Sequence, residues 1–168
     1  IVIDIETSGV DPTQHGILSI GSVDFETGDE FYGECRLDFG LGWTNEALVI
    51  NGFTVEQILD SSKQHSSNLL VDFMEWAKPR SSMLAGQNVG SFDLQFLLAC
   101  HKNHDVVNKW NFRYHTIDLH SVAFGKFKKS YPLPKICKLL NVDPEPEIHN
   151  ALTGAKTVAE CLKRLLND

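Results

Sequence analysis

The chain has 168 residues, of which 42% are apolar and 22% charged, and a formal net charge of −7. Length and composition predict one soluble globular domain over residues 1–168, and no apolar segment approaches the length of a membrane span. The negative charge makes long duplex nucleic acid an unfavourable partner, although a local cation site would still attract a phosphate.

The cysteines are dispersed along the chain and form no Cys-x-x-Cys pair. This spacing argues against a zinc site and predicts reduced thiols in a cytoplasmic protein. No charged-then-apolar signal segment opens the sequence. Ile1 already lies within a predicted strand, so we expect a few native residues before it.

Residues 1–6 predict a strand, because β-branched apolar residues dominate them. Asp4 and Glu6 alternate with Ile5 and therefore point to the same face of that strand. Two like charges about 6 to 7 Å apart repel each other unless a cation lies between them. The pair predicts either a metal site or a strand end that turns into solvent.

The following residues predict a hairpin and then helices. Turn-forming residues at 7–12 end the first strand beside the carboxylates, and an antiparallel hairpin follows over 17–25 and 30–37. Thr44 and Thr54 each begin a short helix, and a helical stripe over 69–77 ends before Pro79.

A buried strand at 83–85 is followed by a helix, for which Ser91 is the predicted cap. Asp93 then lies in the first helical turn. There it either serves a site beside the strand ends or interacts favourably with the helix dipole.

The last third predicts a strand at 112–118, with Asp118 at its end or capping a helix from Leu119. A short helix follows at 133–140, then a rigid acidic connector at 143–147 and a final helix with an apolar stripe over 151–165. His149 falls just before or within its first turn. Lysines and aromatic residues interleave over 124–131. This segment is either a contact for nucleic acid or a solvated loop.

Three stretches resemble, in order, the motifs of the DEDDh family of 3′-5′ exonucleases. They are Ile3-Asp4-Ile5-Glu6-Thr7-Ser8-Gly9, then Gly86-Gln87-Asn88-Val89-Gly90-Ser91-Phe92-Asp93, and His149-Asn150-Ala151-Leu152-Thr153-Gly154-Ala155. The resemblance implies an α/β, ribonuclease H-like fold with a mixed central β-sheet flanked by α-helices.

It also implies roles for four residues. Asp4, Glu6 and Asp93 would hold two divalent ions, Mg²⁺ or Mn²⁺, and His149 would be the general base that takes a proton from the attacking water. The partner would be the 3′ end of a single-stranded nucleic acid, DNA or RNA.

The resemblance further implies the residues that bind substrate. The loop Thr7, Ser8, Gly9 and Val10 would accept the terminal nucleotide, with Val10 packed on a base, and Asn88 and Phe92 would contribute from the second motif. The sequence does not specify an oligomer or a polymerase partner.

The chain departs from the family at Gly154, where family members carry a fourth metal-binding Asp. Glu160 should point elsewhere on the helix, and Glu145 and Glu147 are not expected to replace the missing ligand. We therefore expect a metal-dependent exonuclease that is slow, with a preference for Mn²⁺, and that Gly154→Asp accelerates at least tenfold. The alternative is an inactive nucleic-acid-binding or protein-interacting pseudo-nuclease.

Overall fold

A computed structural model of the chain describes residues 1–104, 106 and 109–167. The described elements are β1 (Val2–Thr7), β2 (Ile17–Val23), β3 (Glu30–Glu34), α1 (Asn45–Asn51), α2 (Val55–Ile58), α3 (Ser66–Ala77), β4 (Leu84–Gly86), α4 (Asp93–Asn103), β5 (Thr116–Asp118), α5 (Leu119–Phe127), α6 (Leu133–Leu140) and α7 (Ala151–Asn167). None of these helices is long and apolar enough to cross a membrane.

The five described strands form one mixed sheet in the order β3-β2-β1-β4-β5. The pairs β1–β2 and β2–β3 are antiparallel, whereas β1–β4 and β4–β5 are parallel. The predicted hairpin and the mixed, helix-flanked sheet are therefore confirmed. β1 is the central strand, so the residues at its end are surrounded by the rest of the fold.

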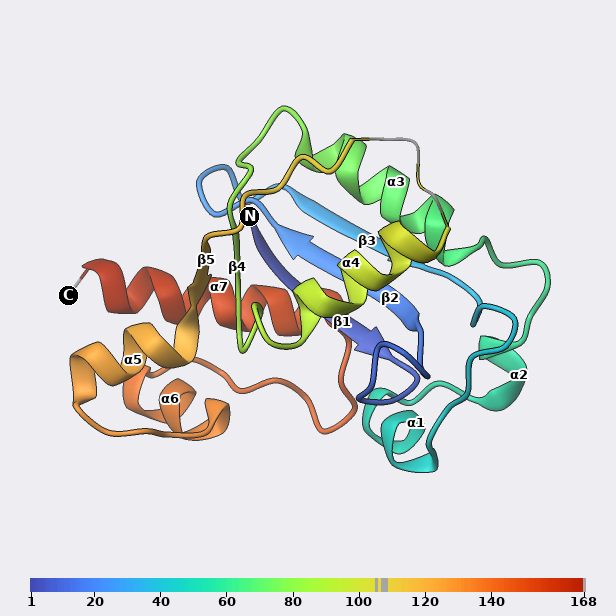
Figure 1. Cartoon of the computed structure of the whole chain (residues 1–168). Helices are drawn as coiled ribbons and strands as arrows, with labels where there is room; N and C mark the ends of the chain where they lie inside the picture. The colour runs from blue at the N-terminus through green and yellow to red at the C-terminus, as the bar shows by residue number, and fades with distance from the viewer. Residues whose placement is uncertain (105, 107–108, 168) are drawn as a thin grey trace.

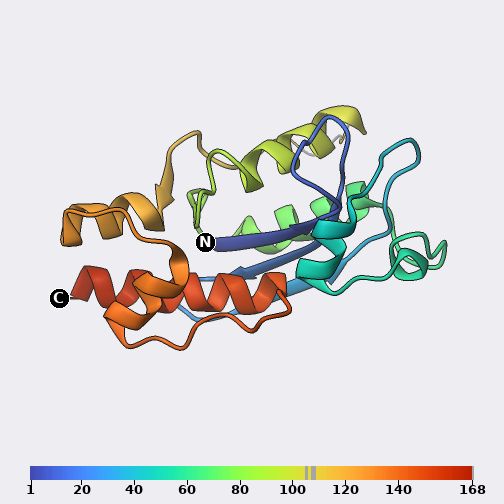
Figure 2. The ribbon, with the colours of Figure 1, turned by 90° about the horizontal axis from the view of Figure 1, so that it is seen from below.

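Helices cover both faces of the sheet (Figures 1 and 2). Ile3 and Ile5 of β1 pack on one face against residues of α3 and α4, such as Phe73 and Phe96. Val2 and Val23 pack on the opposite face against α7, α5 and α6. This alternation along β1 is the period of two expected for a strand buried on both sides.

Local signals set several helix boundaries as predicted. Thr44 caps α1, and Thr54 forms a capping box with Gln57 at the start of α2. Asp118 both ends β5 and caps α5, since its side chain accepts from the Ser121 backbone N–H.

Two predictions at the element ends are wrong. Ser91 does not cap α4, because the helix begins after Phe92, and the Ser91 hydroxyl donates instead to the Asn88 carbonyl. β5 starts at Thr116, because residues 112–115 do not pair with β4.

Candidate active site

The carboxylates of β1 lie on the face of the sheet that carries α7. Asp4 pairs with Gly21 of β2, and Glu6 pairs with Ser19. Glu6 is buried and Asp4 is partly buried. A register shift between Glu6 and Thr7 ends the regular ladder here. The structure thus places both acidic side chains inside the fold, and the alternative of a strand end turned into solvent is wrong.

Asp93 reaches the same place from the first turn of α4, as the sequence predicts. It is only 2% exposed, and its Oδ1 has no hydrogen-bond partner among the described residues. Its charge acts on both Asp4 and Glu6. A buried carboxylate oxygen without a donor is costly, which points to a cation or a proton as its missing partner.

The beginning of α7 lies directly on β2. A Cβ at Gly21 would collide with backbone atoms of Ala151 and Leu152, so only glycine permits this approach. Asn150 caps the helix, since its Oδ1 accepts from the Leu152 N–H at 3.1 Å and the Thr153 N–H at 3.3 Å. This packing brings residue 154 over the carboxylates of β1.

His149 precedes α7 and lies next to the carboxylates. Its backbone N–H donates to the Ile50 carbonyl at 2.9 Å, which attaches the loop to α1. Its side chain remains 45% exposed. An anchored backbone with an accessible imidazole is the arrangement that a general base requires.

Glu145, which the sequence analysis did not expect to replace the missing ligand, lies beside Glu6 and His149. Its side chain is 9% exposed, and its Oε2 lies 3.7 Å from His149 Nδ1. Ligand atoms of Glu6, Glu145 and His149 all lie within 4.8 Å of one another. Glu145 therefore reaches the cavity, contrary to the low expectation for it. Glu147 is exposed, and Glu160 pairs with Arg164 at 2.8 Å, as expected for residues that point elsewhere.

Asp4, Glu6, Glu145 and His149 line a cavity of about 320 Å³, whereas Asp93 is not part of its lining. Its lining includes Asp4, Glu6, Thr7, Gly9, Val10, Phe92, Glu145, His149 and Gly154, and no Lys or Arg belongs to it among the described residues. Val10 is 79% exposed at the rim. The lysine-rich segment 124–131 does not contribute to the lining.

The loop after β1 is held by its own hydrogen bonds. Ser8 is fully buried, and its hydroxyl donates to the Gly42 carbonyl at 2.7 Å, so its side chain shapes the loop. Asn51 donates to the Thr7 carbonyl at 3.0 Å from inside the cavity lining. Asn51 carried no motif that sequence reasoning could have used.

The second motif contributes unevenly to the cavity. Phe92 lines it, whereas Asn88 is exposed, has a positive φ of 56° and does not line it. Gln87 does line it, and its Oε1 is buried without a hydrogen-bond partner among the described residues. Gln87 is the neighbour of the predicted Asn88 in the sequence. The path of the turn decides which of the two side chains reaches the cavity, and it directs Gln87 there.

The acidic groups perturb one another strongly. Burial raises the pKa of Asp4 well above its usual range, and the charges of Asp93, Glu6 and Glu145 raise it further. Burial, with Glu145 and Asp93, raises the pKa of Glu6 to about 8, and burial raises that of Asp93 to about 7. Burial also raises the pKa of Glu145, against the opposing effect of His149.

The donor set fits divalent cations. Carboxylate oxygens are the preferred ligands of hard ions such as Mg²⁺ and Mn²⁺, and an imidazole is compatible with Mn²⁺ or Zn²⁺. The buried Asp93 Oδ1 offers a lone pair that no described residue satisfies. Clustered carboxylates of raised pKa in a cavity are also typical of functional sites.

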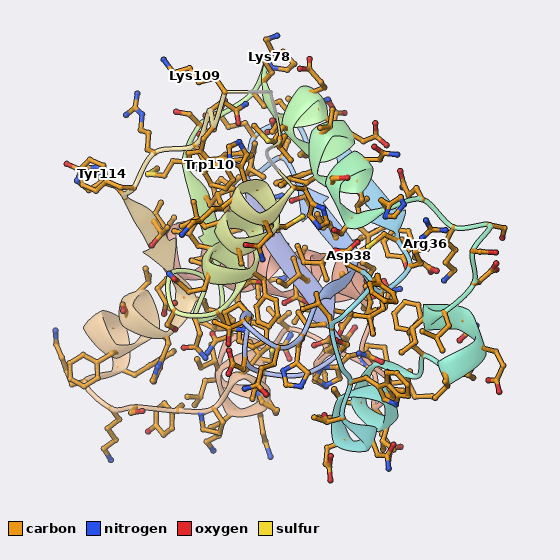
Figure 3. All side chains as sticks on the ribbon, turned by 45° about the vertical axis from the view of Figure 1, so that its right-hand side comes forward. Arg36, Asp38, Lys78, Lys109, Trp110 and Tyr114 are labelled. Carbon is orange, nitrogen blue, oxygen red and sulfur yellow. The ribbon has the colours of Figure 1, made fainter. Side chains whose placement is uncertain are left out.

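A second polar cluster lies elsewhere and resembles a serine triad in composition only. Ser66 donates to Asp38, and His104 Nε2 lies 3.0 Å from Asp38 Oδ2. The Ser66 hydroxyl donates to the Asp38 carboxylate and lies 3.3 Å from His104 Nε2, but Ser66 is only 1% exposed, so a substrate would not reach it. Figure 3 shows Asp38 and Arg36 on the segment after β3. The hydrogen bond from Ser66 to Asp38 joins the start of α3 to this segment.

Comparisons with known proteins identify the family of this chain. The family described as Exonuclease, of the RNase T type, matches residues 1–162. DNA polymerase III subunit epsilon of Rickettsia conorii is 31% identical over 176 residues, which cover 99% of this chain and 73% of the relative.

Solved structures show the same fold. The nuclease domain of 3′hExo, a DEDDh family member bound to rAMP, superposes with a TM-score of 0.72 at 18% identity, over 99% of this chain and 90% of that one. The zinc-bound E. coli exonuclease I–ssDNA complex gives a TM-score of 0.79 at 14% identity. That superposition covers 99% of this chain and 40% of exonuclease I.

Fold and site together define a nuclease of the ribonuclease H-like class. The extent of the family match, with the order of the three motifs, shows that the chain belongs to the DEDDh exonuclease family.

Proposed function

We propose that the chain is a metal-dependent 3′-5′ exonuclease that releases mononucleotides from single-stranded ends. The observation that carries the proposal is that residues of three separate motifs come together. Asp4, Glu6 and His149 line one cavity, and the charge of the buried Asp93 acts on Asp4 and Glu6. Repulsion among such carboxylates is a cost that a bound cation would offset, which supports a cation-dependent function.

The residues divide the work between ion binding and proton transfer. Asp4 would contact two ions, Glu6 the ion nearer the attacking water and Asp93 the other. When bound, Mg²⁺ or Mn²⁺ supplies positive charge at the scissile phosphate and lowers the pKa of water. His149 would accept the proton of the attacking water, and its partial exposure supports this role because it would give that proton a path to solvent.

The loop at the rim would bind the terminal nucleotide. Val10 projects from it and Phe92 lines the cavity, so a base at a strand end could pack on apolar surface. A cavity of about 320 Å³ suits one nucleotide rather than a duplex. The absence of Lys and Arg from the described lining leaves phosphate binding to the metal ions.

Similarity to DNA polymerase III epsilon subunits supports DNA as the substrate and a polymerase as the partner. A partner that delivers the 3′ end would also compensate for the negative charge of this chain, which by itself attracts DNA poorly.

A labelled oligonucleotide tests the proposal. A single strand carrying a 5′ label, incubated with Mg²⁺ or Mn²⁺, should shorten stepwise from its 3′ end, and a 3′-terminal phosphate should slow the first step. Asp4→Ala should abolish the ladder. Internal cuts, or a ladder that persists in EDTA or in the variant, would overturn the proposal.

A second candidate follows from Gly154, which lacks the carboxylate of the family motif. A pseudo-nuclease would bind single-stranded DNA without shortening it at any metal concentration. Retention of the other four site residues favours the enzyme. Metal-dependent release of mononucleotides that Asp4→Ala abolishes would exclude the pseudo-nuclease.

A further inference from the structure

The space above Gly154 is occupied by carboxylates from other parts of the chain. A Cβ built on Gly154 would collide with Asp4 Oδ2, and it would lie 3.1 Å from Glu145 Oε1. An Asp side chain at 154 would extend from that Cβ toward the same region. The carboxylate of Glu145 therefore lies close to where the carboxylate of the family's Asp would be.

The chain around Glu145 holds it in this position. Pro144 and Pro146 flank it and restrict the backbone on both sides, so less backbone conformational entropy is lost when this segment is ordered. The Asn150 backbone N–H approaches Glu145 Oε1 at 3.4 Å. Glu147, two residues further, carries the same charge but is exposed, which makes it a matched control.

The neighbours of Glu145 are Glu6, which would bind the water-activating ion, and His149, which would accept the proton of the attacking water. Glu6 and His149 offer ligand atoms within 4.8 Å of a Glu145 oxygen and of each other. Asp93, which is 2% exposed, leaves a buried oxygen without a hydrogen-bond partner among the described residues. This independent observation indicates that the acidic cluster lacks a partner, a cation or a proton, and is not a solvated surface.

We propose that Glu145 supplies the fourth carboxylate of the metal site, in place of the Asp that the family carries at position 154. The inference rests on the metal-dependent function proposed above. In this interpretation the site has not lost a ligand at Gly154. The fourth carboxylate comes from the loop before α7 instead of from the helix, and glycine at 154 leaves room for the Asp4 and Glu145 carboxylates. The chain then retains four carboxylates and a histidine.

Mn²⁺ binding to the whole chain tests this without a catalytic readout. Calorimetry or electron paramagnetic resonance of free Mn²⁺ should show that Glu145→Gln weakens the tightest site at least tenfold, whereas Glu147→Gln changes it less than twofold. Gln keeps the shape and an acceptor for the Asn150 N–H, so a purely structural role would leave Mn²⁺ affinity unchanged. Melting curves without metal verify that both variants fold.

The outcomes separate this inference from the proposed function. Equal Mn²⁺ affinity of the Glu145→Gln and Glu147→Gln variants would overturn the role of Glu145, even if the enzyme degrades DNA. Weakened binding in Glu145→Gln, in a chain that never shortens an oligonucleotide, would support the ligand and overturn the exonuclease. A wild-type chain that binds no Mn²⁺ would overturn both.

Discussion

Gly154→Asp tests whether the site lacks a ligand or has already replaced it. The sequence alone predicts that this substitution accelerates hydrolysis. The structure changes that expectation, because the new Cβ would collide with the Asp4 carboxylate and approach Glu145 Oε1 to 3.1 Å. Accommodating the side chain requires Asp4 to rotate, and it adds a further carboxylate to a cluster that already repels itself.

The cost can be bounded. Overpacking typically costs about 1 to 3 kcal/mol, and replacing a helical glycine recovers about 0.3 kcal/mol. A like charge at about 4 Å adds up to about 4 kcal/mol at an effective dielectric constant near 20, which protonation or a bound ion reduces. We expect the metal-free variant to lose about 2 kcal/mol, or about 4 to 8 °C in melting temperature for a chain of this size.

The assay compares four proteins at saturating Mn²⁺: wild type, Gly154→Asp, Glu145→Gln and the double variant. Gly154→Asp alone should be no faster than wild type. In the Glu145→Gln background the same substitution should raise the rate, since it returns the missing charge to the site. A tenfold acceleration by Gly154→Asp alone would refute the reasoning, because it would mean that Glu145 does not act as the fourth ligand.

Three further substitutions test the site and its support. His149→Ala should lower the hydrolysis rate by about 10² to 10⁴ while Mn²⁺ affinity stays within about threefold; an equal loss in Mn²⁺ affinity, measured by calorimetry, would instead make His149 a metal ligand. Asp93→Asn should raise the melting temperature without metal, because it removes a buried charge, and should shrink the Mn²⁺-induced rise; an unchanged metal-induced rise would contradict its role. Gly21→Ala should cost about 3 kcal/mol or more in urea unfolding, since its methyl group would meet the α7 backbone, and a variant of wild-type stability would contradict that packing.

Local patterns predicted the parts of the fold that local physics determines. Alternating apolar residues gave β1 and the hairpin, and Thr44 and Thr54 gave helix starts because their side chains satisfy backbone N–H groups. Ser91 failed as a cap because its hydroxyl bonds the Asn88 carbonyl in the turn before α4. Such competition between neighbouring acceptors is not visible in a sequence.

Some residues of the site could likewise be predicted from local patterns, and others could not. Asp93 and His149 occur in motifs whose spacing from a strand or a helix start already determines their direction. Glu145 lies in a loop, and its carboxylate reaches the site only because the path from α6 to α7 brings it there. That path depends on the close approach of α7 to Gly21 and on the His149–Ile50 backbone hydrogen bond, which are tertiary contacts.

The central claim is that this acidic cluster is a metal site completed by Glu145. Crystals soaked in MnCl₂ and measured at the manganese absorption edge would test it most directly. The account predicts an anomalous peak within coordination distance of Asp4, Glu6 and Glu145, beside Gly154. A map without a peak there, or a peak with the Glu145 carboxylate turned away from it, would contradict the account.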